Sequence, residues 1–66
     1  MKTEIRNVKH GNMFTLKPIE EPTESQVWIR DEWDRHEKKY LAHKFDDVNR
    51  ERMFRSETAV YTGFTF

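Results

Sequence analysis

The sequence predicts a small all-β domain over residues 1–66, folded as a five-stranded small barrel or as a strongly bent antiparallel meander. Its two Trp, two Tyr and five Phe are too many aromatic residues for a disordered chain of 66 residues. Runs of strand-forming residues alternate with clusters of turn residues along the whole length. Only residues 48–54 predict a helix, so we expect five strands with one short helix before the last.

The first strand is predicted at residues 2–8, with Ile5 as its clearest core residue. Residues 9–12 (KHGN) predict a turn, because glycine and asparagine adopt positive φ at low cost. Residues 13–19 predict the second strand. Pro18 cannot donate a hydrogen bond to a neighbouring strand, so this end is expected to be an edge or a strand terminus.

Residues 20–25 (EEPTES) predict an acidic loop. The next two runs of strand formers, residues 26–33 and 38–45, are separated by Asp34-Arg35-His36-Glu37. This arrangement is typical of a β-hairpin with a four- to five-residue loop.

A short helix is predicted at residues 48–54 (VNRERMF), because Asp46 and Asp47 could cap its amino-terminal end. Residues 58–66 (TAVYTGFTF) alternate and are rich in β-branched and aromatic residues, which predicts a final strand with a bulge at Gly63. Its last ring, Phe66, is expected to be buried in the monomer beside Ile5 and Phe14, or in a homodimer formed through this strand.

Side chains alternate across a strand, so residue parity can separate core from surface in the predicted hairpin. The odd positions include four aliphatic or phenyl side chains, and this face is predicted to be the core: Val27, Ile29, Leu41 and Phe45. The opposite face is then predicted to point outward with two aromatic rings and two cations: Trp28, Arg30, Tyr40 and Lys44.

Five strands with a short helical turn before the last resemble the SH3-like small barrels. The resemblance covers the whole chain, and it implies a fold and no function, since one fold carries many functions. An OB-fold normally places its helix between the third and fourth strands. A meander sheet with one flanking helix is the main alternative architecture.

Composition excludes several classes of function. The chain has no cysteine, so it has no disulfide and no thiolate metal site, which is consistent with the cytoplasm. The start has no apolar run typical of a signal peptide, and no stretch has the roughly 18 apolar residues that span a bilayer. His10, His36 and His43 lack metal-ligand spacing, and Ser25 and Ser56 lack a nucleophile motif. We therefore expect a cytoplasmic, non-enzymatic protein without a cofactor.

The outward face of the hairpin gives the most specific functional hypothesis, which is weak binding of single-stranded or structured nucleic acid. Bases stack on aromatic rings while cations follow the phosphates. The predicted binding residues are Trp28, Arg30, Arg35, Lys38, Lys39, Tyr40 and Lys44. The same face could instead stabilise the sheet through cross-strand pairs. It could also bind a protein partner or a second copy, because aromatic residues with arginine are typical of interface hot spots.

Several short segments resemble short uncharacterised proteins of bacteria and their mobile elements. The segments that carry this resemblance are Gly11-Asn12-Met13-Phe14-Thr15, Lys17-Pro18, Val27-Trp28-Ile29-Arg30, Lys38-Lys39-Tyr40, Phe45-Asp46-Asp47-Val48-Asn49 and Phe64-Thr65-Phe66. The resemblance implies a bacterial or phage-related source, and it assigns no functional residue.

Overall fold

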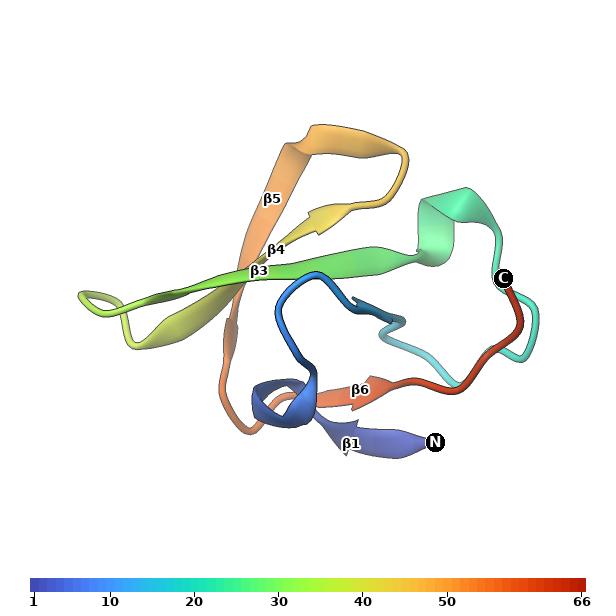
Figure 1. Cartoon of the computed structure of the whole chain (residues 1–66), viewed down its shortest axis with the longest axis horizontal. Helices are drawn as coiled ribbons and strands as arrows, with labels where there is room; N and C mark the ends of the chain where they lie inside the picture. The colour runs from blue at the N-terminus through green and yellow to red at the C-terminus, as the bar shows by residue number, and fades with distance from the viewer.

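The computed structural model describes all 66 residues, which form two antiparallel sheets (Figure 1). One sheet has the order β2 (Met13–Phe14), β3 (Trp28–Asp34), β4 (Lys39–Lys44) and β5 (Asp47–Arg55), and the other pairs β1 (Lys2–Glu4) with β6 (Ala59–Tyr61). The mainly β class is confirmed, and the four-stranded sheet is an antiparallel meander. The two sheets do not join into a closed barrel.

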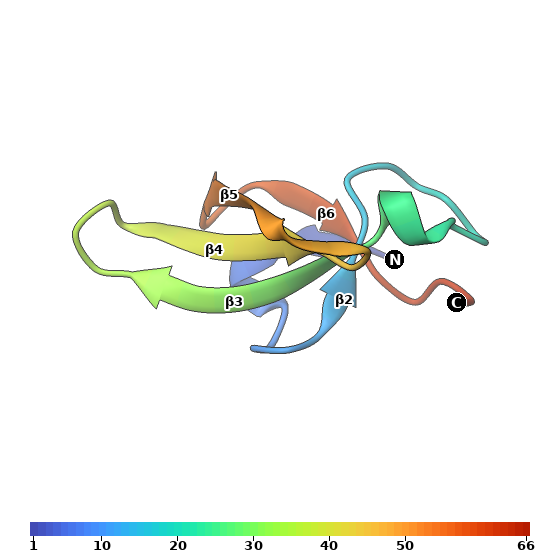
Figure 2. The ribbon, with the colours of Figure 1, turned by 90° about the horizontal axis from the view of Figure 1, so that it is seen from above.

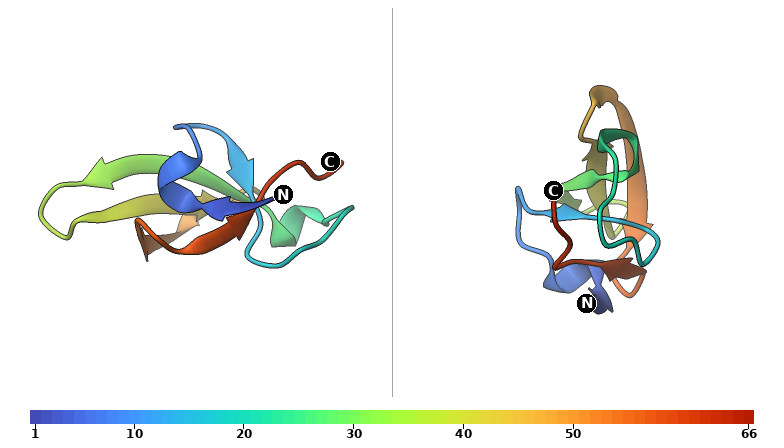
Figure 3. Two further views of the ribbon diagram at one scale, coloured as in Figure 1. Left: turned by 90° about the horizontal axis from the view of Figure 1, so that it is seen from below. Right: turned by 90° about the vertical axis from the view of Figure 1, so that its right-hand side faces the viewer.

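The small sheet covers one face of the large one, and we call this covered side the inner face. Seen from below, β1, β6 and the 3₁₀ turn η1 (Ile5–Asn7) lie across the four-stranded sheet (Figure 3, left). Seen from above, β3 and β4 run side by side, and β2 meets β3 near one end (Figure 2). The core between the layers consists of Ile5, Val8, Phe14, Trp28, Ala42, Phe54 and Val60.

Aromatic rings meet edge to face in this core. The ring of Phe54 lies 5.5 Å from that of Trp28 and 5.9 Å from that of Phe14, between centroids. Ala42 is fully buried, and its small side chain leaves room for the larger rings around it. Such edge-to-face pairs stabilise a core by about 0.5–1.5 kcal/mol beyond the area they bury.

The predicted face assignment of the hairpin is wrong. Trp28 is only 6% exposed on the inner face, whereas Ile29 and Leu41 are half-buried on the outer face and Phe45 is 39% exposed. Only Val27 of the four predicted core residues is fully buried. The reason is long-range: β1, η1 and β6 cover the side that carries the tryptophan, and parity alone cannot tell which side of a sheet is covered.

The predicted helix is also wrong, because residues 48–54 belong to β5. Asp47 does accept a backbone N–H, that of Asn49, at 3.0 Å, but it does so at the start of β5, directly after the turn that follows β4. An aspartate accepts the same local hydrogen bond in a turn as at a helix cap, so this signal did not distinguish the two. With β5, the chain has six strands instead of five.

The other elements agree with the predictions in position and differ in length. Ile5 is fully buried as expected, but the first strand ends at Glu4. The second strand ends at Phe14, and the last ends at Tyr61. The acidic loop contains the 3₁₀ turn η2 (Glu24–Gln26). Neither 3₁₀ turn exceeds three residues, and the structure contains no helix with the length and apolarity needed to cross a bilayer.

The carboxyl-terminal residues lie outside the sheets. Phe66 is half exposed, and its ring packs against Phe45 at 4.9 Å between centroids rather than beside Ile5 and Phe14. Tyr61 pairs with Lys2 on one side and forms a bridge to Thr15 on the other. The predicted homodimer through this strand stays a prediction, although part of the edge that it would use is occupied.

Candidate functional site

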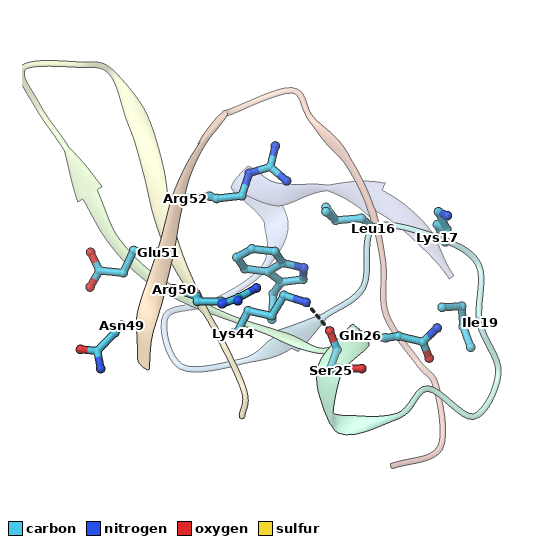
Figure 4. A pocket seen from close by; sticks show the side chains of 11 residues that line it. Leu16, Lys17, Ile19, Ser25, Gln26, Lys44, Asn49, Arg50, Glu51 and Arg52 are labelled. Carbon is cyan, nitrogen blue, oxygen red and sulfur yellow. Dashed lines mark hydrogen bonds between the residues drawn. The ribbon is translucent and has the colours of Figure 1, made fainter. Parts of the chain in front are cut away.

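A cleft of about 600 Å³ opens beside the inner face, between β5 and the segment that leads from β2 to β3 (Figure 4). Its walls carry four cations, one carboxylate and three apolar side chains. The lining residues are Leu16, Lys17, Ile19, Ser25, Gln26, Trp28, Lys44, Asn49, Arg50, Glu51 and Arg52.

The alternation of side chains along β5 gives this wall its charge. Figure 4 shows Arg50 and Arg52 on the side of β5 that faces Lys44 and Leu16, while Asn49 and Glu51 point away from it. The one carboxylate among the lining residues is therefore turned outward. Both arginines face the cleft.

Trp28 forms the floor of the cleft, and cations lie over it. The Lys44 ammonium is 5.4 Å from the centre of the indole, and the Arg52 guanidinium carbon is 5.8 Å from it. Arg52 also lies 5.1 Å from the ring of Phe54. Long cationic side chains can cover aromatic surface while their charges stay in water, which explains how a ring next to a cleft is only 6% exposed.

Most cations of the cleft have no acidic partner. Arg50 forms a long, exposed ion pair with Asp47, at 3.6 Å between Nε and Oδ2. Lys44 donates a hydrogen bond to the backbone carbonyl of Ser25, and Lys17, Lys44 and Arg52 form no ion pair with a carboxylate. The cleft is therefore a locally positive region of a chain whose net charge is zero.

The residues predicted from the sequence fall into separate groups. Trp28 and Lys44 lie in the cleft. Farther along the inner face, the Arg30 guanidinium stacks 4.3 Å above the ring of Tyr40, which lies 4.6 Å from the ring of Trp33. The Nε of Arg30 is buried without a hydrogen-bond partner. Trp28, Arg30, Tyr40 and Lys44 thus share one face of the hairpin, as predicted, but that face is the inner one and not the outward one.

The remaining predicted cations lie at the far end of the β3–β4 hairpin. Arg35 and Lys38 belong to its loop, and Lys39 begins β4. The hollow beside Trp33 is lined by the carboxylates of Glu32 and Asp34 together with Arg35. These carboxylates repel a polyanion, so the far end of the β3–β4 hairpin is a less favourable anion site than the cleft.

Sequence reasoning missed Lys17, Arg50 and Arg52. The two arginines stand two residues apart, which places them on one face of a strand. This spacing is present in the sequence, but the prediction of a helix at residues 48–54 places the two arginines differently. Lys17 comes to the cleft from a loop across the fold, and no local pattern could have placed it there.

The outer face offers different chemistry. His43 and Asp31 form a half-buried pair at 2.6 Å between Nδ1 and Oδ2. Nowhere in the chain do three or more His, Asp or Glu side chains gather in the arrangement of a metal site. Asp31 and His43 line a shallow hollow of this face together with His10, Glu32 and Glu51.

Comparison of the chain with protein-family models, with curated proteins and with solved structures finds no match.

Proposed function

We propose that this protein is a non-enzymatic binding module that holds single-stranded or flexible nucleic acid weakly through the cleft. The observation that carries the proposal is the convergence of Lys44, Arg50 and Arg52 around Trp28, with Lys17 on the opposite wall. Cations in such a groove attract a phosphate backbone in a sequence-independent way.

The dimensions and polarity of the cleft favour a ligand of this kind. A volume of about 600 Å³ lies within the range of small-ligand sites, about 300–1,000 Å³, so it accommodates a nucleotide-sized unit. Leu16 and Ile19 supply apolar surface for a base or sugar next to the cations. Guanidinium groups bind phosphate oxygens in two-pronged geometry, and Arg50 and Arg52 provide two of them.

Base stacking plays a smaller part than the sequence predicted. Trp28 is 6% exposed, so its face is covered and cannot receive a base without movement of Lys44 or Arg52. Trp33 is 40% exposed at the hairpin end and is the more accessible ring. The binding energy in this proposal is therefore mainly electrostatic, and the affinity should fall steeply with salt.

The test is fluorescence anisotropy of a labelled oligonucleotide at about 50 and about 200 mM salt. If the four cations each contact one phosphate, a plot of the logarithm of the binding constant against the logarithm of the salt concentration should have a slope of about −3. The variant Lys17→Gln/Arg50→Gln removes two exposed cleft cations, and it should weaken binding about tenfold or more and make the slope shallower by about one to two.

The matched control is Lys2→Gln/Lys9→Gln, which removes the same charge from exposed residues that do not line the cleft. It should change the affinity by no more than about twofold. The proposal fails if the unaltered protein binds no oligonucleotide at the lower salt concentration. It also fails if the cleft variant and the control lose affinity equally, because binding would then follow net charge alone.

A further inference from the structure

The strand β5 forms one margin of the four-stranded sheet (Figure 3, right). It pairs with β4 on one side, and no strand pairs with its other side. Regular pairing with β4 covers Glu51–Arg55, whereas residues 48–50 have no partner on β4 and form a bulge. The straight part of this open edge is therefore the five-residue segment Glu51-Arg52-Met53-Phe54-Arg55. An unpaired edge of this kind is a template for another strand.

This segment is complementary to a copy of itself in one antiparallel register. If Met53 lies opposite Met53 of a second copy, each Glu51 faces an Arg55 of the other chain. The two pairs of opposite charge and the central apolar pair then share one face of the joined sheet. A shift of the centre to Arg52 or Glu51 would place that charged residue opposite its own copy, and directly opposed like charges are destabilising.

The charged residues concerned lack ion-pair partners within the monomer. Arg55 faces Lys39 across the β4–β5 pair, and Glu51 faces His43, which is already bound to Asp31. Neither Glu51 nor Arg55 forms an ion pair in the monomer.

Glu57, two residues farther along the chain, is close enough to be affected by the charge of Arg55. The pKa of Glu57 is lowered chiefly by a hydrogen bond from the Ser56 hydroxyl and only to a smaller extent by the charge of Arg55. Arg55 therefore stays available to a carboxylate from another chain.

We propose that β5 is a self-association edge, at which Glu51–Arg55 pairs antiparallel with the same segment of a second copy. The two-fold axis passes between the two Met53 residues, perpendicular to the sheet. Met53 is 42% exposed in the monomer, and the contact between two copies removes apolar surface from water. The bulge at residues 48–50 restricts pairing to the five regular residues. Because a two-fold contact uses the same edge of both copies, it closes a dimer and does not extend into a fibre.

A dimer of this symmetry has a consequence for the cleft. A two-fold axis perpendicular to a sheet keeps the same face of both copies on the same side. Both clefts would open on one surface, on either side of the seam, with Arg50 and Arg52 of each copy near it. One longer strand of nucleic acid could then contact both clefts and bind more tightly than to either alone. Formation of the dimer itself does not require that ligand.

The test is sedimentation equilibrium between about 10 μM and about 1 mM, the range expected for an interface below standard size. The unaltered protein should approach dimer mass toward the upper end. Glu51→Arg and Arg55→Glu each convert two attractive pairs into two repulsive ones, and each should weaken the dimer about tenfold or more. The double variant exchanges the two charges, restores the pairs, and should recover the dimer.

Glu32→Arg and Arg35→Glu are the matched controls, since they change net charge equally on the β3–β4 hairpin. Circular dichroism of each variant shows whether the monomer remains folded. The proposal is overturned if the protein stays monomeric across the range, or if both single reversals leave the dimer intact. Failure of the folded double variant to recover the dimer would equally exclude this register.

Discussion

Replacement of Trp28 by alanine should destabilise this protein more than any substitution on the outer face of the sheet. The indole is 6% exposed, and it packs edge to face on Phe54 in the centre of the core. Truncation of a buried tryptophan to alanine costs about 3–5 kcal/mol, through the lost transfer free energy and the cavity that remains. The free energy of unfolding expected for a 66-residue domain is about 3–10 kcal/mol, so Trp28→Ala should lie near the limit of folding.

The neighbouring residue provides the comparison. Ile29 lies on the same strand but on the outer face, where it is half-buried. A full isoleucine-to-alanine truncation in a core costs about 2–5 kcal/mol, so a half-buried side chain should cost about 1–2 kcal/mol. Trp28→Phe retains a ring in the core and should fall between the two alanine variants.

Urea unfolding followed by far-ultraviolet circular dichroism measures all three variants on one scale. Circular dichroism is preferable to fluorescence because two of the variants lack one of the two tryptophans. We expect Trp28→Ala to be the most destabilising variant and Ile29→Ala the least, with Trp28→Phe between them. If Ile29→Ala cost more than Trp28→Ala, the outer face would be the true core and the layer arrangement described above would be refuted.

Two further predictions concern the hairpin loop and the carboxyl-terminal residues. Lys38 has a φ of 55°, in the left-handed region, so Lys38→Gly should raise the free energy of unfolding by about 0.5–1 kcal/mol. Lys38→Ala keeps the strained backbone, and an equal gain from it would show that strain is not the cause. A double-mutant cycle of Phe45→Ala and Phe66→Ala should give a coupling energy of about 0.5–1.5 kcal/mol from their edge-to-face contact. A coupling energy of zero in thermal or urea melts would contradict that contact.

The hairpin was predictable because its determinants are local. Two runs of strand formers around Asp34-Arg35-His36-Glu37 are enough to specify β3, β4 and the loop between them. Which face of the hairpin is buried is not determined by the hairpin sequence itself. It depends on Ile5, Val8 and Val60, which come from the two ends of the chain and meet the sheet only in the folded state.

The basic wall of the cleft was hidden by a single wrong assignment. Asp46-Asp47 before an apolar residue fits both a helix cap and a tight turn, and the weak apolar periodicity of residues 48–54 did not decide between them. In a strand, side chains two residues apart lie on the same face, so Arg50 and Arg52 share one face of β5. The cross-strand neighbours of these arginines, and the approach of Lys17, depend on the register of the sheet and the path of a loop.

Trp28 belongs at once to the core and to the floor of the cleft, which links folding to binding in this protein. Its ring packs on Phe54 below, while Lys44 and Arg52 cover it from the side of the cleft. Loss of binding after substitution of Trp28 would therefore not distinguish a ligand contact from a collapsed cleft. Arg50 is different, because its side chain is 74% exposed and only Lys44 and Arg52 form cation–π contacts with the indole.

The same linkage has a thermodynamic consequence. A ligand that binds only the folded cleft raises the free energy of unfolding by RT ln(1 + [L]/Kd), about 0.4 kcal/mol when its concentration equals Kd. An oligonucleotide that binds as proposed must therefore raise the melting temperature of the unaltered protein. At the same concentration, the oligonucleotide must raise the melting temperature of the Lys17→Gln/Arg50→Gln variant by a smaller amount. Since neither substitution touches the core, the difference between the two shifts measures the contribution of the cleft cations to binding, separately from the stability of the fold.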